Sequence, residues 1–283
     1  MYSTLVSTQE LAAIAPQCFI VDCSHDLADP TAGPRVYAQA HVPGAVFMHV
    51  DHDLSAAKIG TPPVNGRHPL PQRAALAERL AALGLKRGQQ VVVYDRSGAM
   101  YAVRLWWLLR WLGHSAVAVL DGGLQAWQAA GLPVTADVPT HPRGDFTAQA
   151  SLAAFITKDD VAANLRTRAR VLVDARAPER FRGEVEPLDP VAGHIPGALN
   201  RFFKQNLQGD TGPFKPPEQL RAEFTALLGK YGPSEVVAQC GSGVTGCHHI
   251  LAMEHAGLHG ALLYPGSWSE WCVDEGLPRA SGA

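Results

Sequence analysis

The chain of 283 residues is 47% hydrophobic and carries 24 basic against 26 acidic residues. At about 100–200 residues per domain, it predicts one large or two medium domains with apolar cores, and it excludes a disordered tail protein. The balanced charge, without a long basic run, argues against nucleic acid as a main partner.

Neither a membrane span nor a targeting segment is visible in the sequence. No window approaches the roughly 18 uninterrupted apolar residues of a spanning helix. Residues 1–16 lack the basic and then apolar regions of a secretory signal. The five cysteines include no Cys-x-x-Cys pair. We therefore expect a cytoplasmic protein with reduced thiols, no membrane partner and no metal ion.

The first half of the chain alternates short apolar runs with helical patterns. Residues 18–23 (CFIVDC) and 91–95 (VVVYD) predict strands, whereas 75–84 and 102–113 predict helices. The next segment, 137–150, contains Pro and Gly, is polar and lacks helical periodicity, so we predict the linker there.

The second half repeats the alternation. Residues 171–174 and 235–240 predict strands, and 217–232 and 244–257 predict helices. Strands that alternate with helices of this length imply crossover connections. The sequence therefore predicts an α/β protein in which each half has a mainly parallel sheet with helices on both faces.

Four ordered matches relate the two halves. The first pairs CFIVDC with VLVD, and the second pairs AHVPGAV from Ala40 with GHIPGAL from Gly193. The third pairs VVVYD with EVVAQC. The fourth pairs LDGGLQAWQAAGLPV with YPGSWSEWCVDEGLPR, so that Trp127 matches Trp271. We predict an N-terminal domain over 1–140 and a C-terminal domain over 141–283. Residues that recur in both halves are interpreted as structural, and they include Asp22, Asp174, His41 and His194.

The halves differ in the loop after one repeated strand. The first half has Asp95 at the strand end, where the second has Cys240. In open α/β sheets the ligand crevice lies at the carboxyl ends of the strands. Gly241 and Gly243 let successive N–H groups turn inward, and the helix starting near Val244 adds its positive end. This loop favours a thiolate or a persulfide on Cys240. The alternative is an ordinary buried thiol.

Several segments resemble the tandem-domain rhodanese superfamily. They are CGSGVTG at 240–246, the His-Ile/Val-Pro-Gly-Ala segments at 41–45 and 194–198, and Gly-Ser-Trp-x-x-Trp at 266–271. The Cys-Gly-Ser-Gly-Val-Thr loop is similar to that of the 3-mercaptopyruvate sulfurtransferases. The resemblance covers nearly the whole chain and implies two rhodanese-like domains, of which only the second is catalytic.

The resemblance also implies a reaction that needs no metal or organic cofactor. Cys240 would attack the sulfur of 3-mercaptopyruvate, release pyruvate and carry the sulfur as a persulfide. A thiol, such as that of thioredoxin, or cyanide would then take the sulfur.

A proton relay beside the cysteine is implied as well. By motif matching it consists of Ser242, His68 in the HPLP segment and Asp53 in the DHDL segment, and it would protonate the enolate left by C–S cleavage. Alternatively, His68 is a loop histidine without a role and Asp53 a turn-forming or capping carboxylate. We expect the cysteine loop to bind substrate through Gly241, Gly243, Val244 and Thr245.

A 2-oxo acid calls for fixed positive charge, which arginine supplies to a carboxylate through its bidentate fork. The segment ARAPERFRG matches an Arg-Phe-x-Gly element of the family and selects Arg180; the alternative is a surface salt bridge. The family's second arginine follows a Glu-Pro step, but Leu188 stands there in this chain. Arg182, or a residue of the first domain, would have to substitute.

Cys247 could be a resolving thiol, or a metal ligand together with His248 and His249. We interpret it as a buried helix cysteine, because free cysteine packs as a small hydrophobe. Neighbouring side chains on a helix point about 100° apart, so the three cannot all face one ion.

Three other functions remain as alternatives. Thiosulfate sulfurtransferases share the resemblance but usually carry Cys-Arg-Lys-Gly, so the neutral Gly241 and Ser242 favour mercaptopyruvate without excluding thiosulfate. A cysteine phosphatase would need an arginine where Gly246 stands. A non-catalytic rhodanese-like binding module commonly lacks the cysteine, as the first half does, but the second half retains it.

Overall fold

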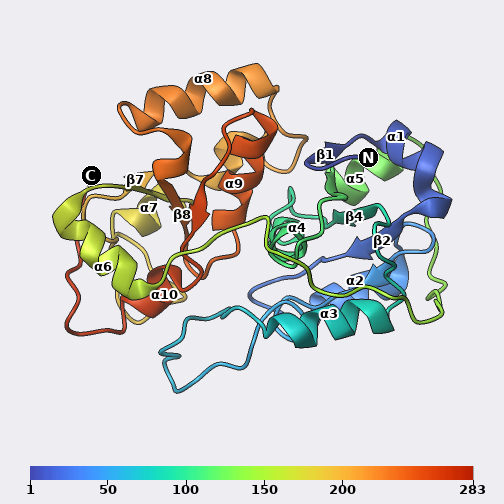
Figure 1. Cartoon of the computed structure of the whole chain (residues 1–283), viewed down its shortest axis with the longest axis horizontal. Coiled ribbons are helices and arrows are strands. Elements are labelled where there is room, and N and C mark those ends of the chain that lie inside the picture. The colour runs from blue at the N-terminus through green and yellow to red at the C-terminus, as the bar shows by residue number, and fades with distance from the viewer. Residues whose placement is uncertain (283) are drawn as a thin grey trace. The chain divides into compact units, whose positions relative to one another are not determined.

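The computed structural model describes residues 1–282 (Figure 1). The chain divides into two compact units, each built on one all-parallel sheet. The first unit comprises Met1–Ala56, Pro71–Ala153 and Leu207–Phe214. The rest of the described chain, which includes residues 57–70, forms the second unit. The predicted α/β class with parallel sheets is confirmed.

Residues 141–153 pack against the first unit, although we predicted that the second domain begins at residue 141. The Gly144 N–H donates to the Ala81 carbonyl at 2.8 Å, and the Gln149 N–H donates to the Leu112 carbonyl at 2.8 Å. Main-chain hydrogen bonds can hold a segment that has no hydrophobic periodicity, so composition did not reveal this packing.

The sheet of the first unit has the order β1-β5-β4-β2-β3. Every residue of β2, β4 and β5 is buried, which requires cover on both faces of the sheet. The strands are β1 (Leu5–Val6), β2 (Phe19–Asp22), β3 (Val46–Phe47), β4 (Val91–Tyr94) and β5 (Val117–Leu120). The helices are α1 (Thr8–Ile14), η1 (Ala15–Gln17, 3₁₀), α2 (Ala32–Gln39), α3 (Arg73–Ala82), α4 (Ala102–Trp111) and α5 (Gly123–Ala129).

The sheet of the second unit has the order β7-β6-β8-β9, and β6 and β8 are buried at every residue. The strands are β6 (Val171–Asp174), β7 (Leu199–Asn200), β8 (Val236–Gln239) and β9 (Leu262–Leu263). The helices are α6 (Lys158–Thr167), α7 (Pro178–Phe181), η2 (Phe203–Asn206, 3₁₀), α8 (Pro217–Leu228), η3 (Pro233–Glu235, 3₁₀), α9 (Gly246–His255) and α10 (Ser267–Trp271). Helix α8 packs on α9 (Figure 1).

The repeat seen in the sequence is present in the contacts of both units. The Trp127 indole N–H donates to the Pro133 carbonyl at 2.7 Å, and the matching Trp271 donates to the Pro278 carbonyl at 2.9 Å. Each of these bonds fixes a helix against the Gly-Leu-Pro turn that follows it.

The two repeated histidines have equivalent structural positions. The His41 ring stacks on Tyr37 with centroids 4.1 Å apart, and the His194 ring stacks on Phe181 at 3.8 Å. In both cases Nδ1 lies 2.8 Å from the carbonyl oxygen of the residue on which the ring stacks. These contacts agree with the structural interpretation of both histidines.

Asp95 occupies the loop of the first unit that corresponds to the cysteine loop. Its buried carboxylate accepts backbone N–H bonds from Ser97 (2.7 Å), Ala99 (3.0 Å), Tyr101 (2.7 Å) and Ala102 (2.9 Å). Burial raises the pKa of Asp95, and these four N–H groups oppose that shift. The Asp95 carboxylate therefore occupies the four backbone N–H groups of this loop, and they are not available to a bound anion.

Replacing Asp95 with asparagine should destabilise the first unit. The amide keeps one acceptor oxygen but turns an NH₂ group toward two of the four N–H groups, so we expect a loss of about 2–4 kcal/mol in the free energy of unfolding. Urea unfolding followed by fluorescence measures the loss. Asp26→Asn is the control, because Asp26 is exposed and its contact with the Ala28 N–H needs only one oxygen. Equal stability of the two variants would contradict the role of Asp95.

Among residues 1–282, no helix combines the length and the apolar composition needed to cross a membrane.

Candidate active site

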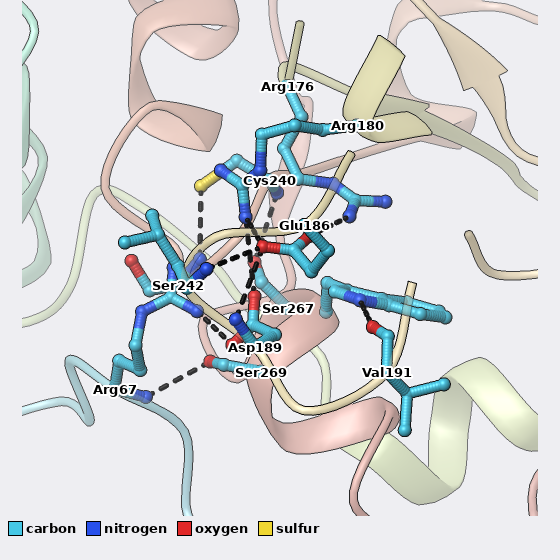
Figure 2. Close-up of polar contacts among 12 residues, drawn as sticks. Arg67, Arg176, Arg180, Glu186, Asp189, Val191, Cys240, Ser242, Ser267 and Ser269 are labelled. Atoms are coloured by element: carbon cyan, nitrogen blue, oxygen red, sulfur yellow. Dashed lines mark hydrogen bonds and ion pairs between the residues drawn. The ribbon is translucent and has the colours of Figure 1, made fainter. Parts of the chain in front are cut away.

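Cys240 directly follows β8, at the carboxyl edge of the second sheet, and only 2% of it is exposed. Its N–H donates to the Ser267 hydroxyl at 3.1 Å. Its Sγ lies 3.4 Å from the Ser242 backbone nitrogen, whose N–H points at the sulfur (Figure 2). A backbone donor aimed at sulfur stabilises negative charge there.

The start of helix α10 fixes the orientation of the cysteine loop. The Trp268 N–H donates to the Cys240 carbonyl at 3.0 Å, and the Ser269 N–H donates to the Gly241 carbonyl at 2.9 Å. In a trans peptide the N–H points away from the carbonyl. The N–H groups of Gly241 and Ser242 therefore point away from α10, toward the sulfur side of the loop.

Of the two glycines that we selected in the loop, Gly243 has a conformation that requires glycine. Gly243 has φ +75°, and a Cβ on it would collide with the Pro265 carbonyl. All residues from Cys240 to Thr245 are buried, and Val244 and Thr245 lead directly into α9. The loop is thus a compact turn between a strand and a helix, as the sequence predicted.

His68 and Ser242 are brought together. Nδ1 of His68 lies 2.7 Å from Oγ of Ser242, and both side chains are buried. Although His68 comes from the first half of the sequence, residues 57–70 belong to the second compact unit. The pair therefore lies in the same unit as Cys240, beside the N–H that contacts the sulfur.

Asp53, the third residue of the predicted relay, lies in the first unit. One carboxylate oxygen accepts the His49 N–H at 2.7 Å, and the other lies 2.8 Å from Nε of Arg79. These contacts tie a loop to helix α3. A part for Asp53 in the relay stays a prediction.

Arg180 lies beside the loop, near the end of α7. Its Nη2 lies 2.6 Å from Oε1 of Glu186 and 3.4 Å from Oδ2 of Asp189. Within the described residues, its buried Nε has no hydrogen-bond acceptor. A Cβ placed on Gly241 would lie 3.6 Å from both terminal nitrogens of Arg180, so the guanidinium faces the residue next to Cys240.

Arg67 also lies beside the cysteine loop, although the sequence did not select it. Its side chain forms an ion pair with Asp189, and its backbone N–H donates to Oγ of Ser269 at 3.0 Å. A Cβ on Gly241 would lie only 2.7 Å from Nη2 of Arg67. Figure 2 shows Arg67 and its acidic partner gathered near Cys240. Its place next to His68 was the available signal.

The two positions considered for the second arginine lie elsewhere. Arg182 makes a bidentate contact with Glu184 at 2.7 and 2.9 Å, and both side chains are exposed. Leu188 is 38% exposed and donates its N–H to Glu186. We named Arg182 or a residue of the first domain as substitutes for the second arginine. The arginine that lies at the loop is Arg67, which comes from the first half of the sequence.

Buried acidic side chains offset the charges of Arg67 and Arg180. Asp189 is almost fully buried; burial and the nearby Glu186 charge raise its pKa, while Arg67 and Arg180 oppose the shift. The Arg176 guanidinium binds Asp174 at 2.8 Å and lies over the Trp268 ring, and its Nη1 lies 3.4 Å from Glu186, which also pairs with Arg180. Arg176 belongs to the scaffold beneath the site.

The Cys247 segment is packed as interior. The Cys247 thiol is fully buried and donates to the Gly243 carbonyl at 3.4 Å. The two histidines share one partner, because Nδ1 of His248 and Nδ1 of His249 both accept from the Asn206 amide, at 3.1 and 3.0 Å. Burial lowers the pKa of His249 well below its usual value. The Nδ1 lone pairs of His248 and His249 therefore bind the Asn206 amide.

Comparisons with known proteins agree with the resemblance noted in the sequence. The family model described as a rhodanese-like domain matches residues 7–130 and 157–274. A probable 3-mercaptopyruvate sulfurtransferase of Pseudomonas aeruginosa is 49% identical over 282 residues, covering 98% of each chain. The thiosulfate sulfurtransferase of Mus musculus is 36% identical over 284 residues, covering 96% of this chain and 92% of its own.

The fold is similar to that of a solved structure from Escherichia coli. SseA, described as a 3-mercaptopyruvate sulfotransferase with the rhodanese fold, matches with a TM-score of 0.80 and 30% identity. The match covers 94% of this chain and 99% of SseA.

Proposed function

This chain belongs to the rhodanese family, and from that premise we propose that it is a sulfurtransferase that takes sulfur from 3-mercaptopyruvate. Cys240 carries the sulfur as a persulfide. The observation that carries the donor assignment is the 2.7 Å contact between Ser242 and His68 beside the cysteine, in a loop without charged side chains. The similarity to the P. aeruginosa protein supports the same donor.

The first chemical step needs a thiolate and a place for the leaving carbanion. The Cys240 thiolate attacks the donor sulfur, a new S–S bond forms, and the C–S bond breaks with its electrons passing to the three-carbon fragment. The products are the Cys240 persulfide and the enolate of pyruvate. The loop N–H groups and the positive end of α9 stabilise the sulfur anion before and after this transfer.

The Ser242–His68 pair serves the proton that this step requires. The enolate must gain a proton on carbon, and a buried hydroxyl bonded to an imidazole can deliver it without exposing the intermediate to solvent. Arg180 supplies positive charge for the donor's carboxylate. Asp53 is retained as a candidate for orienting His68.

Thiosulfate is a second candidate donor. Arg67 lies over Gly241, so the side-chain charge that the loop lacks is supplied from residues 57–70. A dianionic donor could use this charge, as the likeness to the mouse thiosulfate sulfurtransferase also suggests. The proposed acceptor is a thiol, such as that of thioredoxin, or cyanide. We propose the cytoplasm as the location, where the five cysteines would stay reduced.

Side-by-side kinetics test the donor assignment. We expect kcat/KM for 3-mercaptopyruvate to exceed that for thiosulfate by about 10²-fold or more, because proton delivery by Ser242 and His68 accelerates the first reaction, whereas thiosulfate cleavage gains nothing from it. Cyanide and then a dithiol serve as acceptors. A preference for thiosulfate would contradict the assignment while keeping the persulfide, and no turnover of either donor would favour a binding module.

A further inference from the structure

Two arginines from distant parts of the sequence meet beside Gly241. Arg180 comes from the end of α7, whereas Arg67 comes from the segment that also carries His68. The position where the family pattern expects a second arginine holds Leu188, so the pattern alone leaves the second cation unassigned. Both guanidinium groups nevertheless face the residue next to the nucleophile.

One buried carboxylate, that of Asp189, contacts both arginines. Asp189 pairs with Arg67 through Oδ1 and lies 3.4 Å from Nη2 of Arg180 through Oδ2. The Arg67 backbone is also fixed, because its N–H donates to Ser269, whose own N–H holds the loop carbonyl of Gly241. The position of Arg67 is therefore linked to that of the cysteine loop.

Donor capacity remains at this place after the internal contacts are made. Arg67 uses Nη1 for Asp189 and directs Nη2 at Gly241. Arg180 uses Nη2 for its acidic partners, while its buried Nε has no acceptor among the described residues. A planar carboxylate can accept from two guanidinium groups at once.

We propose that Arg67 is the second arginine of the site that binds the donor's carboxylate, acting with Arg180 over Gly241. The proposal rests on the proposed function for the identity of the donor, but the binding of a carboxylate near Cys240 can be tested without any donor. Gly241 then has a steric role, since the guanidinium groups approach the loop where it has no side chain. Asp189 is a positioning residue.

The test compares two alkylating reagents that differ in charge. Iodoacetate carries a carboxylate and iodoacetamide is neutral, so the ratio of their rates at Cys240, followed by mass spectrometry of its peptide, reports carboxylate binding. We expect Arg67→Met to lower this ratio about tenfold, as for one lost charge-assisted contact. Arg67→Lys should retain part of the ratio, because it keeps the charge but not the fork.

Two further variants sharpen the result. Arg182→Met is the control, because this exposed arginine pairs with Glu184; its ratio should stay within about twofold of wild type. Gly241→Ala should reproduce much of the Arg67→Met effect, because the new methyl group would press on Nη2 of Arg67. An unchanged ratio in Arg67→Met, with a normal iodoacetamide rate, would overturn the proposal.

Steady-state kinetics separate this proposal from the donor assignment. If 3-mercaptopyruvate is the donor, Arg67→Met should raise its KM about tenfold and change kcat much less. If the enzyme does not turn over 3-mercaptopyruvate, the alkylation ratio still decides whether Arg67 binds a carboxylate. Turnover with an unchanged KM would remove Arg67 from the site and leave the proposed function in place.

Discussion

Cys240→Ser is expected to abolish sulfur transfer, with kcat/KM lower by about 10⁴-fold or more for either donor. A serine hydroxyl in the same loop cannot form a persulfide, and the N–H of Ser242 would face a neutral oxygen instead of a thiolate. The measurement is pyruvate release from 3-mercaptopyruvate, with cyanide as the acceptor.

Cys247→Ser is the matched control for this prediction. Cys247 is buried in the first turn of α9 and donates to the Gly243 carbonyl, a bond that a serine hydroxyl can replace. We expect its turnover to stay within several-fold of wild type. A similar loss in both variants would point to a resolving thiol at Cys247, and turnover by Cys240→Ser would exclude Cys240 as the sulfur carrier.

His68→Asn is expected to lower kcat for 3-mercaptopyruvate by about 10²–10³-fold, the usual contribution of a positioned acid or base. The asparagine amide reaches the place of Nδ1, which lies 2.7 Å from the Ser242 hydroxyl, but it cannot relay a proton. Alkylation of Cys240 by iodoacetamide should change little, because this reaction needs only the thiolate. Equal losses in both assays would indicate misfolding of residues 57–70.

Ser242→Ala tests whether the two side chains act as one unit. The single variants should lose similar activity, and the double variant should lose little more than either alone, because each substitution already interrupts the same proton path. Additive losses would mean that Ser242 and His68 contribute separately. The pair would then no longer support the donor assignment.

Local patterns were sufficient to predict the repeated framework. The strand predicted over 171–174 is β6, and the helix predicted over 102–113 appears as α4, which ends two residues earlier at Trp111. Helix α8 ends at Leu228 because Gly229, at φ +58°, turns the chain. Hydrophobic periodicity and turn residues act over a few positions, so they located these elements well.

The same patterns did not predict where long loops dock. Residues 57–70 lack regular secondary structure, yet they carry His68 and Arg67 to the cysteine loop of the second unit. Motif matching selected His68, whereas Arg67 was found from its contacts with Asp189 and Ser269, and the sequence offered no signal for it beyond its place next to His68. The support given to the loop by α10 depends in the same way on tertiary packing.

The most direct test of the central claim is the mass of the protein after reaction with 3-mercaptopyruvate and no acceptor. We predict that wild type gains one sulfur atom on Cys240, with one pyruvate released per chain, and that cyanide or a dithiol removes the added sulfur. The Cys240→Ser protein should gain none. Pyruvate release without added mass on Cys240, or a sulfur atom found on another cysteine, would contradict the account.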